Sequence, residues 1–275
     1  MIMTKEKFTK TIASISECVN SVAKESTLLY SGGIDSTVLL YIIKDIVKRN
    51  NIPVYYIETG LNRESSIEKA IAFCKSQNIN LNVVDIKEQI FKSLNGIVDY
   101  NERRTLLAGI FLETTKRITQ GKSVIDATIR DDSRSLLIET KEFENIQPLK
   151  SLSKRKVLGL LKYLNIDKIY KAPLPFPSGG YSRKIIGVFN EVNLAMIKQV
   201  DEMFTKEINL KSKQIELCDV ILWQSSINNF IFRISSNDKI DIAELEKIIT
   251  KINKKFDFAN KCLVDVSENV KKFYT

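Results

Sequence analysis

Apolar residues in the N-terminal part of the chain alternate between helical and strand spacing. Residues 8–22 carry apolar side chains at intervals of three and four, which predicts an amphipathic helix. Residues 27–30 are typical of a short buried strand, and a glycine turn then leads into a predicted helix over residues 36–49. The same alternation predicts further strands at residues 54–58, 81–85 and 123–128, and further helices at residues 64–76, 101–118 and 154–164.

This order of elements indicates the fold class. Short strands rich in Val, Ile and Tyr that alternate with helix-length segments form βαβ crossovers, and these give a parallel sheet with helices on both faces. We therefore expect an α/β protein with a doubly wound parallel sheet. Pro173, Pro175 and Pro177, followed by Gly179 and Gly180, interrupt every periodic pattern. We place a domain boundary there, between domains 1–177 and 178–275.

The pattern beyond this boundary predicts a smaller C-terminal α+β domain. Strands near residues 214–223 and 228–235 are joined by a tight connection at residues 224–226, which favours antiparallel pairing. The other predicted elements are helices near residues 193–206 and 242–252 and a last strand at residues 261–266. A small mixed domain of this kind can complete a site or form a dimer.

Composition is that of a globular protein and limits the chemistry. The 275 residues are 44% hydrophobic and 27% charged, and no stretch approaches the ~18 consecutive apolar residues of a membrane span. The first residues lack the apolar segment of a signal peptide, so we expect a cytoplasmic protein with no membrane partner. The chain has no histidine, which excludes His-ligated zinc and an imidazole base.

The four cysteines are Cys18, Cys74, Cys218 and Cys262. They lie far apart in sequence, so neither a disulfide framework nor an iron–sulfur site is indicated. The net charge of +9 would suit a polyanion such as tRNA, but the lysines are spread along the chain. Composition therefore favours no nucleic-acid partner, although it does not exclude one.

The glycine turn after the first strand carries the candidate chemistry. Its residues are Ser31, Gly32, Gly33, Ile34, Asp35, Ser36 and Thr37. Such a loop surrounds an anion with backbone N–H groups and the hydroxyls of Ser31 and Ser36, and the following helix directs its positive end to the same point. The two glycines would let the backbone turn with positive φ. Asp35 can hold Mg²⁺ that bridges phosphates, so we predict ATP and Mg²⁺ as ligands.

The loop is not a Walker A motif, because no lysine follows Gly33 at the required spacing. An ordinary Ser-Gly-Gly turn is the alternative interpretation. The position of the loop directly after the first strand of a βαβ repeat favours a nucleotide site. Asp126 ends the predicted fourth strand, where open α/β sheets bind ligands, although a turn or capping role is about as consistent with its position.

The Ser-Gly-Gly-x-Asp-Ser sequence resembles the signature of N-type ATP pyrophosphatases. Several further segments are similar, in the same order, to the ATP pyrophosphatase and dimerisation domains of GMP synthetase. They are Ile57-Glu58-Thr59-Gly60-Leu61, Gly96-Ile97-Val98-Asp99 with Arg103 and Arg104, Pro148-Leu149-Lys150 with Lys154 and Val157, residues 175–180, and Ile185-Ile186-Gly187.

This resemblance implies roles for particular residues. Glu58, Gly60 and Leu61 would contact the adenosine, with Glu58 in place of the family's Asp, and Lys154 would hold the pyrophosphate. Asp35 and Lys154 would therefore carry most of the catalysis. Domain 1–177 would be the ATP pyrophosphatase domain, and domain 178–275 would form a homodimer. We expect no fused glutamine amidotransferase domain, so nitrogen would come from ammonia or from a separate amidotransferase subunit.

Two departures affect the acceptor. The family's lid carries Lys-Ser-His-His-Asn, whereas this chain has a shorter connection through residues 129–134, in which Arg130 and Arg134 could touch phosphate. The family's Lys-Pro-Pro tail also has no counterpart. The leading hypothesis is amination of XMP to GMP with release of AMP and pyrophosphate. The alternatives are a paralogue that adenylates another substrate for amide formation or sulfur transfer, a non-catalytic ATP-binding protein, and a tRNA-modifying enzyme.

Overall fold

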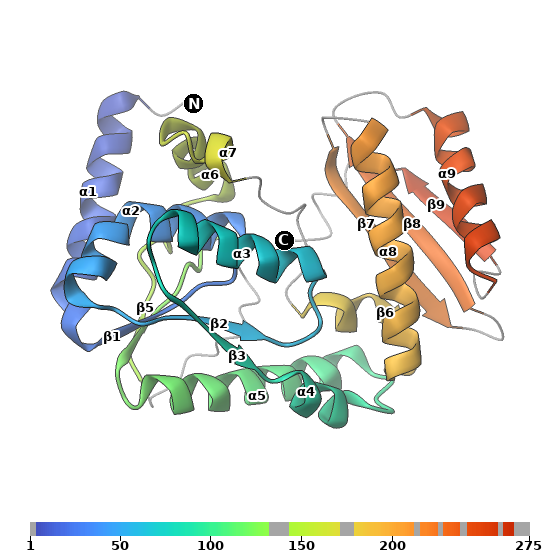
Figure 1. Ribbon diagram of the computed structural model, residues 1–275, viewed down its shortest axis with the longest axis horizontal. Coiled ribbons are helices and arrows are strands. Elements are labelled where there is room, and N and C mark those ends of the chain that lie inside the picture. Colours follow the sequence, from blue (N-terminus) through green and yellow to red (C-terminus); the bar gives the residue numbers. More distant parts are fainter. Residues whose placement is uncertain are drawn as a thin grey trace. The chain divides into compact units, whose positions relative to one another are not determined.

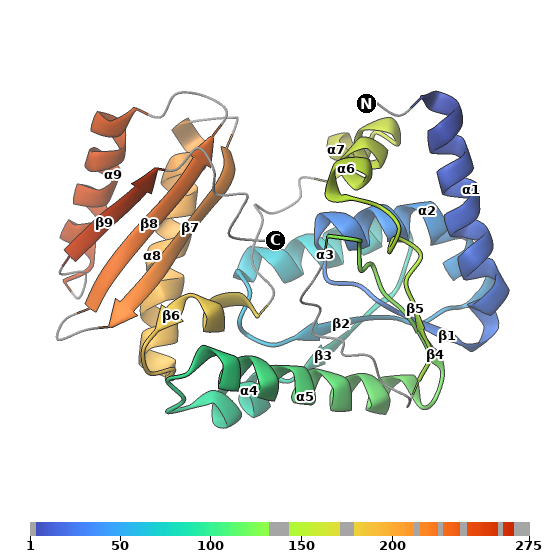
Figure 2. The same ribbon diagram turned by 180° about the vertical axis from the view of Figure 1, so that it is seen from behind.

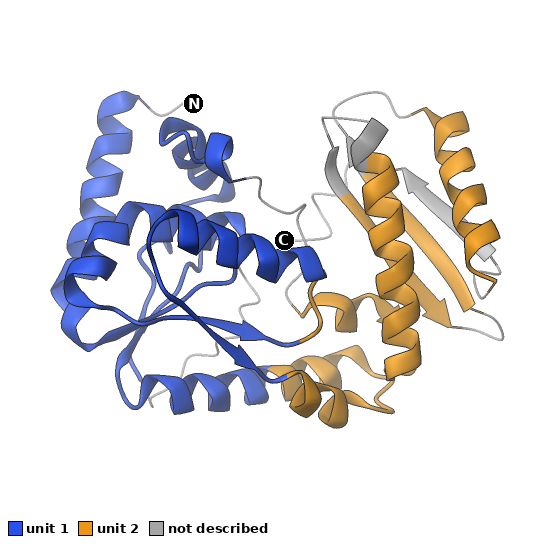
Figure 3. Ribbon diagram, viewed as in Figure 1, with its two compact units in different colours: residues 1–59, 64–86, 108–173 blue, residues 60–63, 87–107, 174–275 orange. Residues whose placement is uncertain are grey.

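A computed structural model describes residues 4–131, 143–170, 179–211, 215–224, 228–236, 241–257 and 261–266. The chain divides into two compact units, coloured separately in Figure 3. The first comprises residues 1–59, 64–86 and 108–173, and the second comprises residues 60–63, 87–107 and 174–275. Within the described ranges, no helix has the length and apolar character needed to cross a membrane.

The first unit contains a five-stranded parallel sheet. Its strands are β1 (Ser26–Leu29), β2 (Val54–Glu58), β3 (Leu81–Asp85), β4 (Ser123–Ile125) and β5 (Asn145–Ile146), in the order β3-β2-β1-β4-β5. Every neighbouring pair is parallel. The predicted α/β fold class is therefore confirmed. The apolar pattern predicts four of these strands and does not predict the two-residue β5.

Helices cover this sheet on both faces (Figures 1 and 2). Along the chain, the strands are preceded or joined by α1 (Lys5–Val22), a short 3-10 turn η1 (Ala23–Glu25), α2 (Ile34–Asn50), α3 (Glu64–Ser76), α4 (Lys87–Leu94) and α5 (Tyr100–Thr119). Two more helices, α6 (Lys154–Tyr163) and α7 (Ile166–Ile169), follow β5. In both views α2 and α3 lie on one face of the sheet and α5 runs along the other. By packing, α4 and the first residues of α5 belong to the second unit.

The core explains why these segments form helices. Apolar side chains of α1, α2, α3 and α6 pack in one cluster with those of β1 and β2, and Val38, Leu39 and Ile43 of α2 are fully buried. The stripe predicted for residues 8–22 faces this core through Phe8, Ile15 and Val19. Helix α2 ends at Asn50 and is capped by Asn51, whose left-handed backbone (φ 51°) directs its N–H to the carbonyls of Val47 and Lys48.

The strand order also positions the glycine loop. From β1 the chain winds outward to β2 and then β3 on one side of the sheet. It then crosses back to form β4 and β5 on the other side of β1. The loop at the carboxyl end of β1 therefore lies where the direction of winding reverses, the position at which open α/β sheets bind ligands.

The second unit contains a four-stranded sheet and two long helices. Besides α4 and the first residues of α5, its elements are η2 (Gly180–Arg183), β6 (Ile185–Ile186), α8 (Glu191–Lys211), β7 (Ile215–Gln224), β8 (Asn228–Ser236), α9 (Ile242–Lys255) and β9 (Lys261–Val266). The sheet order is β6-β7-β8-β9, and α8 and α9 lie on the same face of it in Figures 1 and 2. This confirms the predicted smaller α+β part.

The prediction of antiparallel pairing is right for one pair of strands. Strands β7 and β8 are antiparallel, whereas β6–β7 and β8–β9 are parallel. The reason is the length of the connections: α8 links β6 to β7 and α9 links β8 to β9, and a helical crossover returns the chain in the same direction. The predicted boundary between residues 177 and 178 falls outside the described residues, and the division into two consecutive domains stays a prediction.

Candidate functional site

The glycine loop joins β1 to α2 in a conformation that depends on Gly32. This residue has a φ of 70°, and a Cβ atom there would lie 3.1 Å from Ala70 Cβ and 3.4 Å from the Ser66 carbonyl oxygen. A side chain at position 32 would therefore be strained and crowded by α3. Gly33 is the N-cap residue of α2 and has an ordinary extended backbone. The predicted positive φ is thus confirmed for Gly32 and wrong for Gly33.

The two predicted loop hydroxyls lie together. Ser31 Oγ is 3.0 Å from Ser36 Oγ, Ser36 Oγ donates to the Gly33 carbonyl at 3.1 Å, and the Gly33 N–H reaches Ser31 Oγ at 3.4 Å. The Ser31 side chain is exposed, whereas that of Ser36 is buried. Hydroxyls and the first N–H groups of α2 therefore converge at one helix end, the arrangement that suits an anion.

Asp35 and Lys154 are 119 residues apart in sequence and form an ion pair. Lys154 Nζ lies 2.9 Å from Asp35 Oδ1 and 2.7 Å from Asp35 Oδ2. Asp35 is in the first turn of α2, and Lys154 is the first residue of α6. The Lys154 and Asp35 side chains are 43% and 22% exposed, so solvent screens the pair and it contributes little to folding stability. Its importance is that it brings both predicted catalytic residues to one place.

A contact that the sequence pattern does not predict fixes the start of α6. Asp131 Oδ2 accepts a hydrogen bond from the backbone N–H of Lys154 at 2.7 Å, while the N-cap residue Ser153 makes no side-chain cap. Arg130, suggested as a phosphate contact, is exposed and lies 3.4 Å from Asp131 Oδ1. Arg134 and the rest of the predicted lid from residue 132 on lie outside the described residues.

Buried tyrosines support the loop from behind. The Tyr170 hydroxyl donates a hydrogen bond to the Gly32 carbonyl, and Tyr30 shares a 3.0 Å hydrogen bond with the hydroxyl of Thr37. Burial raises the pKa of both phenols above its ordinary value, so both remain protonated donors at neutral pH. Sequence reasoning misses Tyr170, because it lies 138 residues from its partner and no local pattern marks it.

Thr37 has a packing role in this arrangement. Its side chain is fully buried, and its N–H donates to the Gly33 carbonyl at 3.0 Å within α2. Its hydroxyl and its N–H thus both have partners inside the protein, and its predicted contact with the nucleotide stays a prediction.

Glu58 ends β2 and Asp126 directly follows β4, both at the carboxyl edge of the first sheet. Glu58 is the last residue of β2, and its carbonyl accepts from the Ile86 N–H at 2.9 Å. Asp126 follows β4 and is buried; its Oδ1 accepts from the Thr128 N–H at 2.7 Å and its Oδ2 accepts from Gln147 Nε2 at 3.3 Å. These are the bonds of a turn residue, the alternative that the sequence left open for Asp126.

Gly60 and Leu61 belong to the second unit by their packing. Gly60 has a φ of 72°, and a Cβ there would lie 2.8 Å from both Lys87 Cγ and Phe91 Cζ. Leu61 is buried, and its carbonyl accepts from the Tyr181 N–H at 2.8 Å. The backbone of this segment is therefore tightly held, and its contact with adenosine stays a prediction.

The residues fit a magnesium ion that is bound mainly through phosphate. No group of three or more Cys, Asp or Glu side chains suited to a metal occurs in the part of the chain that the structure describes. A single carboxylate such as Asp35 is nevertheless sufficient for Mg²⁺, which keeps several waters and takes its other ligands from substrate phosphates.

Comparisons with known proteins add family information to this geometry. The NAD synthase family profile matches residues 7–130, which include the glycine loop. A glutamine-hydrolyzing GMP synthase of Helicobacter pylori is 28% identical over 220 residues, which cover 71% of this chain and 42% of that protein. The matched region thus spans less than half of that relative.

Shorter relatives are matched over more of their length. A protein of Methanococcus maripaludis, named as one subunit of a glutamine-hydrolyzing GMP synthase, is 27% identical over 228 residues, which cover 76% of this chain and 73% of that subunit. The Archaeoglobus fulgidus subunit of the same name is 26% identical over 200 residues, or 67% of this chain and 65% of that protein. The comparisons confirm the resemblance to GMP synthase-like N-type ATP pyrophosphatases. ATP is the cofactor that this resemblance implies.

Proposed function

We propose that this protein is an ATP pyrophosphatase that adenylates a substrate, in the manner of a GMP synthase. The observation that carries the proposal is the Asp35–Lys154 pair beside the glycine loop, at the point of the sheet where ligands bind. The ion pair unites a carboxylate that can hold Mg²⁺ with a cation that can hold phosphate. The same two residues are those that the resemblance assigns to the chemistry.

The proposed reaction begins at the α-phosphorus of ATP. An oxygen of the acceptor attacks this atom, the bond to the β-phosphate bridging oxygen breaks, and pyrophosphate leaves with that electron pair. Mg²⁺ at Asp35 would neutralise charge on the phosphates. Lys154, the Ser31 and Ser36 hydroxyls and the N–H groups at the start of α2 would bind the departing pyrophosphate. Catalysis in this scheme is positioning and charge neutralisation, and no protein nucleophile is required.

The acceptor we favour is XMP, with ammonia then displacing AMP to give GMP. The names of the relatives support this assignment. Because this chain is only 28% and 27% identical to these two relatives, we also consider a different acceptor. In the second candidate function the same adenylation serves amide formation or sulfur transfer to another substrate. A sulfur carrier needs a reactive thiol. Cys74 and Cys218 are buried, and burial raises the pKa of each to about 12, which counts against these two residues in that role. Cys18 is exposed, so thiol burial alone does not decide between the two functions.

Two partners belong to the proposal. The relatives that are named as one subunit of a GMP synthase support a separate glutamine amidotransferase subunit as the source of ammonia. A homodimer through the second unit is supported by the face of its sheet opposite α8 and α9, where Ile186 and Trp223 are 50% and 43% exposed. A cytoplasmic location and the absence of a nucleic-acid partner stay predictions.

Pyrophosphate release tests the choice of acceptor. We expect the wild-type chain to release pyrophosphate from ATP when XMP, ammonia and Mg²⁺ are all present, with GMP formed in equal amount. Omission of ammonia should abolish GMP formation. Pyrophosphate without GMP would reject XMP amination and leave the adenylation of another acceptor. ATP binding without any pyrophosphate or AMP under these conditions would favour the non-catalytic alternative.

A further inference from the structure

The segment between β2 and α3 is attached to the second unit at three points. Residues 60–63 pack with that unit, although β2 and α3 on either side of them pack with the first. The segment begins two residues after Glu58 and contains Gly60 and Leu61, which would contact the adenosine if the resemblance to GMP synthetase holds for this protein. The contacts that hold residues 60–63 in place would therefore influence the binding of the nucleotide.

Two backbone contacts hold Leu61. Its carbonyl accepts a hydrogen bond from the Tyr181 N–H at 2.8 Å. Gly180 approaches so closely that a Cβ on this residue would lie 2.2 Å from the Leu61 carbonyl oxygen. Only glycine fits at position 180, where φ is also positive at 56°.

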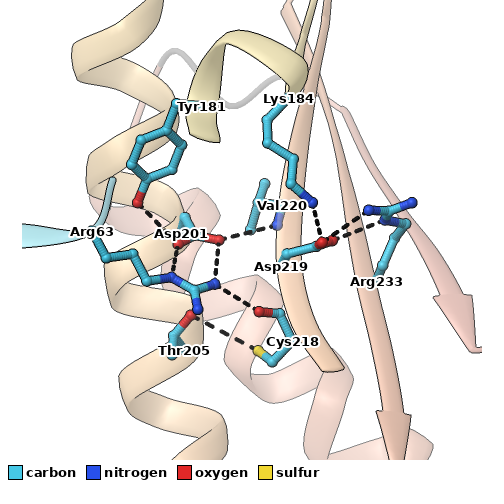
Figure 4. Close-up of polar contacts among 9 residues, drawn as sticks. All are labelled: Arg63, Tyr181, Lys184, Asp201, Thr205, Cys218, Asp219, Val220 and Arg233. Carbon is cyan, nitrogen blue, oxygen red and sulfur yellow. Dashed lines mark hydrogen bonds and ion pairs between the residues drawn. The ribbon is translucent and has the colours of Figure 1, made fainter. Parts of the chain in front are cut away.

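Arg63 provides the third attachment (Figure 4). Its Nε and Nη2 donate to Asp201 Oδ2 and Oδ1 at 2.6 and 3.0 Å, and Nη2 also donates to the Cys218 carbonyl at 2.7 Å. The Arg63 side chain is 6% exposed and that of Asp201 is fully buried. Burial alone would lower the pKa of Arg63, but the hydrogen bonds and charge of Asp201 raise it overall. Arg63 is therefore charged, and its two hydrogen bonds to Asp201 fix it in a planar two-bond geometry.

Other hydrogen bonds hold the Asp201 carboxylate in position for this arginine. It lies on α8 and also accepts from the Tyr181 hydroxyl at 3.0 Å and from the Val220 N–H at 3.2 Å. Its two oxygens thus receive four hydrogen bonds, two from Arg63 and one each from η2 and β7. A buried ion pair is weak evidence for stability, because desolvation offsets the attraction, but it restricts geometry strongly.

We infer that Arg63 is a positioning residue for nucleotide recognition: through Asp201 it holds the 60–63 segment in the conformation in which Gly60 and Leu61 meet the adenosine. This inference rests on the proposed function. It predicts that loss of the pair weakens binding of the adenosine part of ATP and leaves the pyrophosphate subsite at the glycine loop intact.

The second unit offers a matched control. Asp219 on β7 is also fully buried and also takes two hydrogen bonds from an arginine, since Arg233 Nε and Nη2 lie 2.8 Å from its two oxygens. Lys184 is its other cationic partner. These bonds tie Asp219 to β8 and to the end of η2 instead of to residues 60–63. Asp219→Asn should therefore perturb the same unit without releasing the segment.

The test compares Asp201→Asn with Asp219→Asn by isothermal titration calorimetry against ATP and against inorganic pyrophosphate, each with Mg²⁺. We expect Asp201→Asn to raise the Kd for ATP about tenfold and to change the Kd for pyrophosphate by less than about twofold. Asp219→Asn should change neither value by more than about twofold. Equal ATP affinities in the two variants, or equal losses for ATP and pyrophosphate in Asp201→Asn, would overturn the inference.

Milder variants keep the inference testable if Asp201→Asn does not fold, which circular dichroism would report. Tyr181→Phe retains the ring and three of the four bonds to Asp201, and Arg63→Lys retains the charge but loses the two-bond geometry. Both variants should raise the Kd for ATP about threefold and leave the Kd for pyrophosphate unchanged. If both variants fold and bind ATP with wild-type affinity, the positioning role of Arg63 is contradicted. These binding measurements need no turnover. Absence of pyrophosphate release by the wild-type chain would therefore count against the proposed function and not against the positioning role.

Discussion

At the scale of single residues, the orientation of the glycine loop depends on a hydroxyl that comes from far along the chain. Tyr170 donates to the carbonyl of Gly32 from a position that is 5% exposed. The bond directs a partially negative oxygen toward the interior. Since the loop is proposed to hold an anion, an inward carbonyl keeps this oxygen away from the anion.

Tyr170→Phe should raise the KM for ATP about threefold to tenfold with little change in kcat, because one neutral hydrogen bond contributes about 1 kcal/mol. The ring and its edge contact with Phe73 would remain. Tyr163→Phe is the matched control, since the Tyr163 hydroxyl meets Thr9 Oγ1 of α1 at 3.4 Å rather than the loop. Steady-state kinetics would decide, and equal KM values in the two variants would refute the role of the Tyr170 hydroxyl.

At the scale of elements, the site depends on where α6 begins. Lys154 is the first helical residue, and the Asp131 carboxylate binds its N–H from a different segment of the chain. A carboxylate at a helix start pairs with an unsatisfied N–H group and with the positive end of the helix dipole. Asp131 thereby sets the place from which the Lys154 side chain reaches Asp35.

Asp131→Ala should lower the free energy of unfolding by about 1 kcal/mol, as loss of a helix cap does. Arg130→Ala removes the exposed Arg130–Asp131 pair and keeps the cap, so it should cost less than about 0.5 kcal/mol. Urea denaturation of the two variants would measure both values. A smaller loss for Asp131→Ala than for Arg130→Ala would show that Asp131 does not cap α6.

At the scale of the whole molecule, the sequence predicts what is local and periodic. The ranges 54–58, 64–76, 81–85 and 261–266 match β2, α3, β3 and β9 residue for residue, because apolar spacing marks them clearly. Helix α4 escapes prediction because it is only eight residues long, which is too short for its apolar spacing to identify a helix. The parallel pairing of β9 follows from the crossover through α9, which strand patterning alone does not reveal.

The candidate site is predictable only in part. The glycine loop is contiguous in sequence, and Lys154 is found through a resemblance to known enzymes. The supporting contacts join residues such as Tyr170 and Gly32, or Arg63 and Asp201, which are 138 positions apart in both cases. Spacing along the chain cannot indicate such a pair, because its members meet only after the chain has folded.

The most direct test of the proposed chemistry is to identify which bond of ATP is broken. Phosphorus NMR of the wild-type chain with ATP, Mg²⁺, XMP and ammonia should show AMP and pyrophosphate as the phosphate products. Asp35→Asn should lower their rate of formation at least about 100-fold, since it removes the carboxylate proposed to hold the metal. Formation of ADP and orthophosphate, or an unchanged rate in Asp35→Asn, would contradict the central claim.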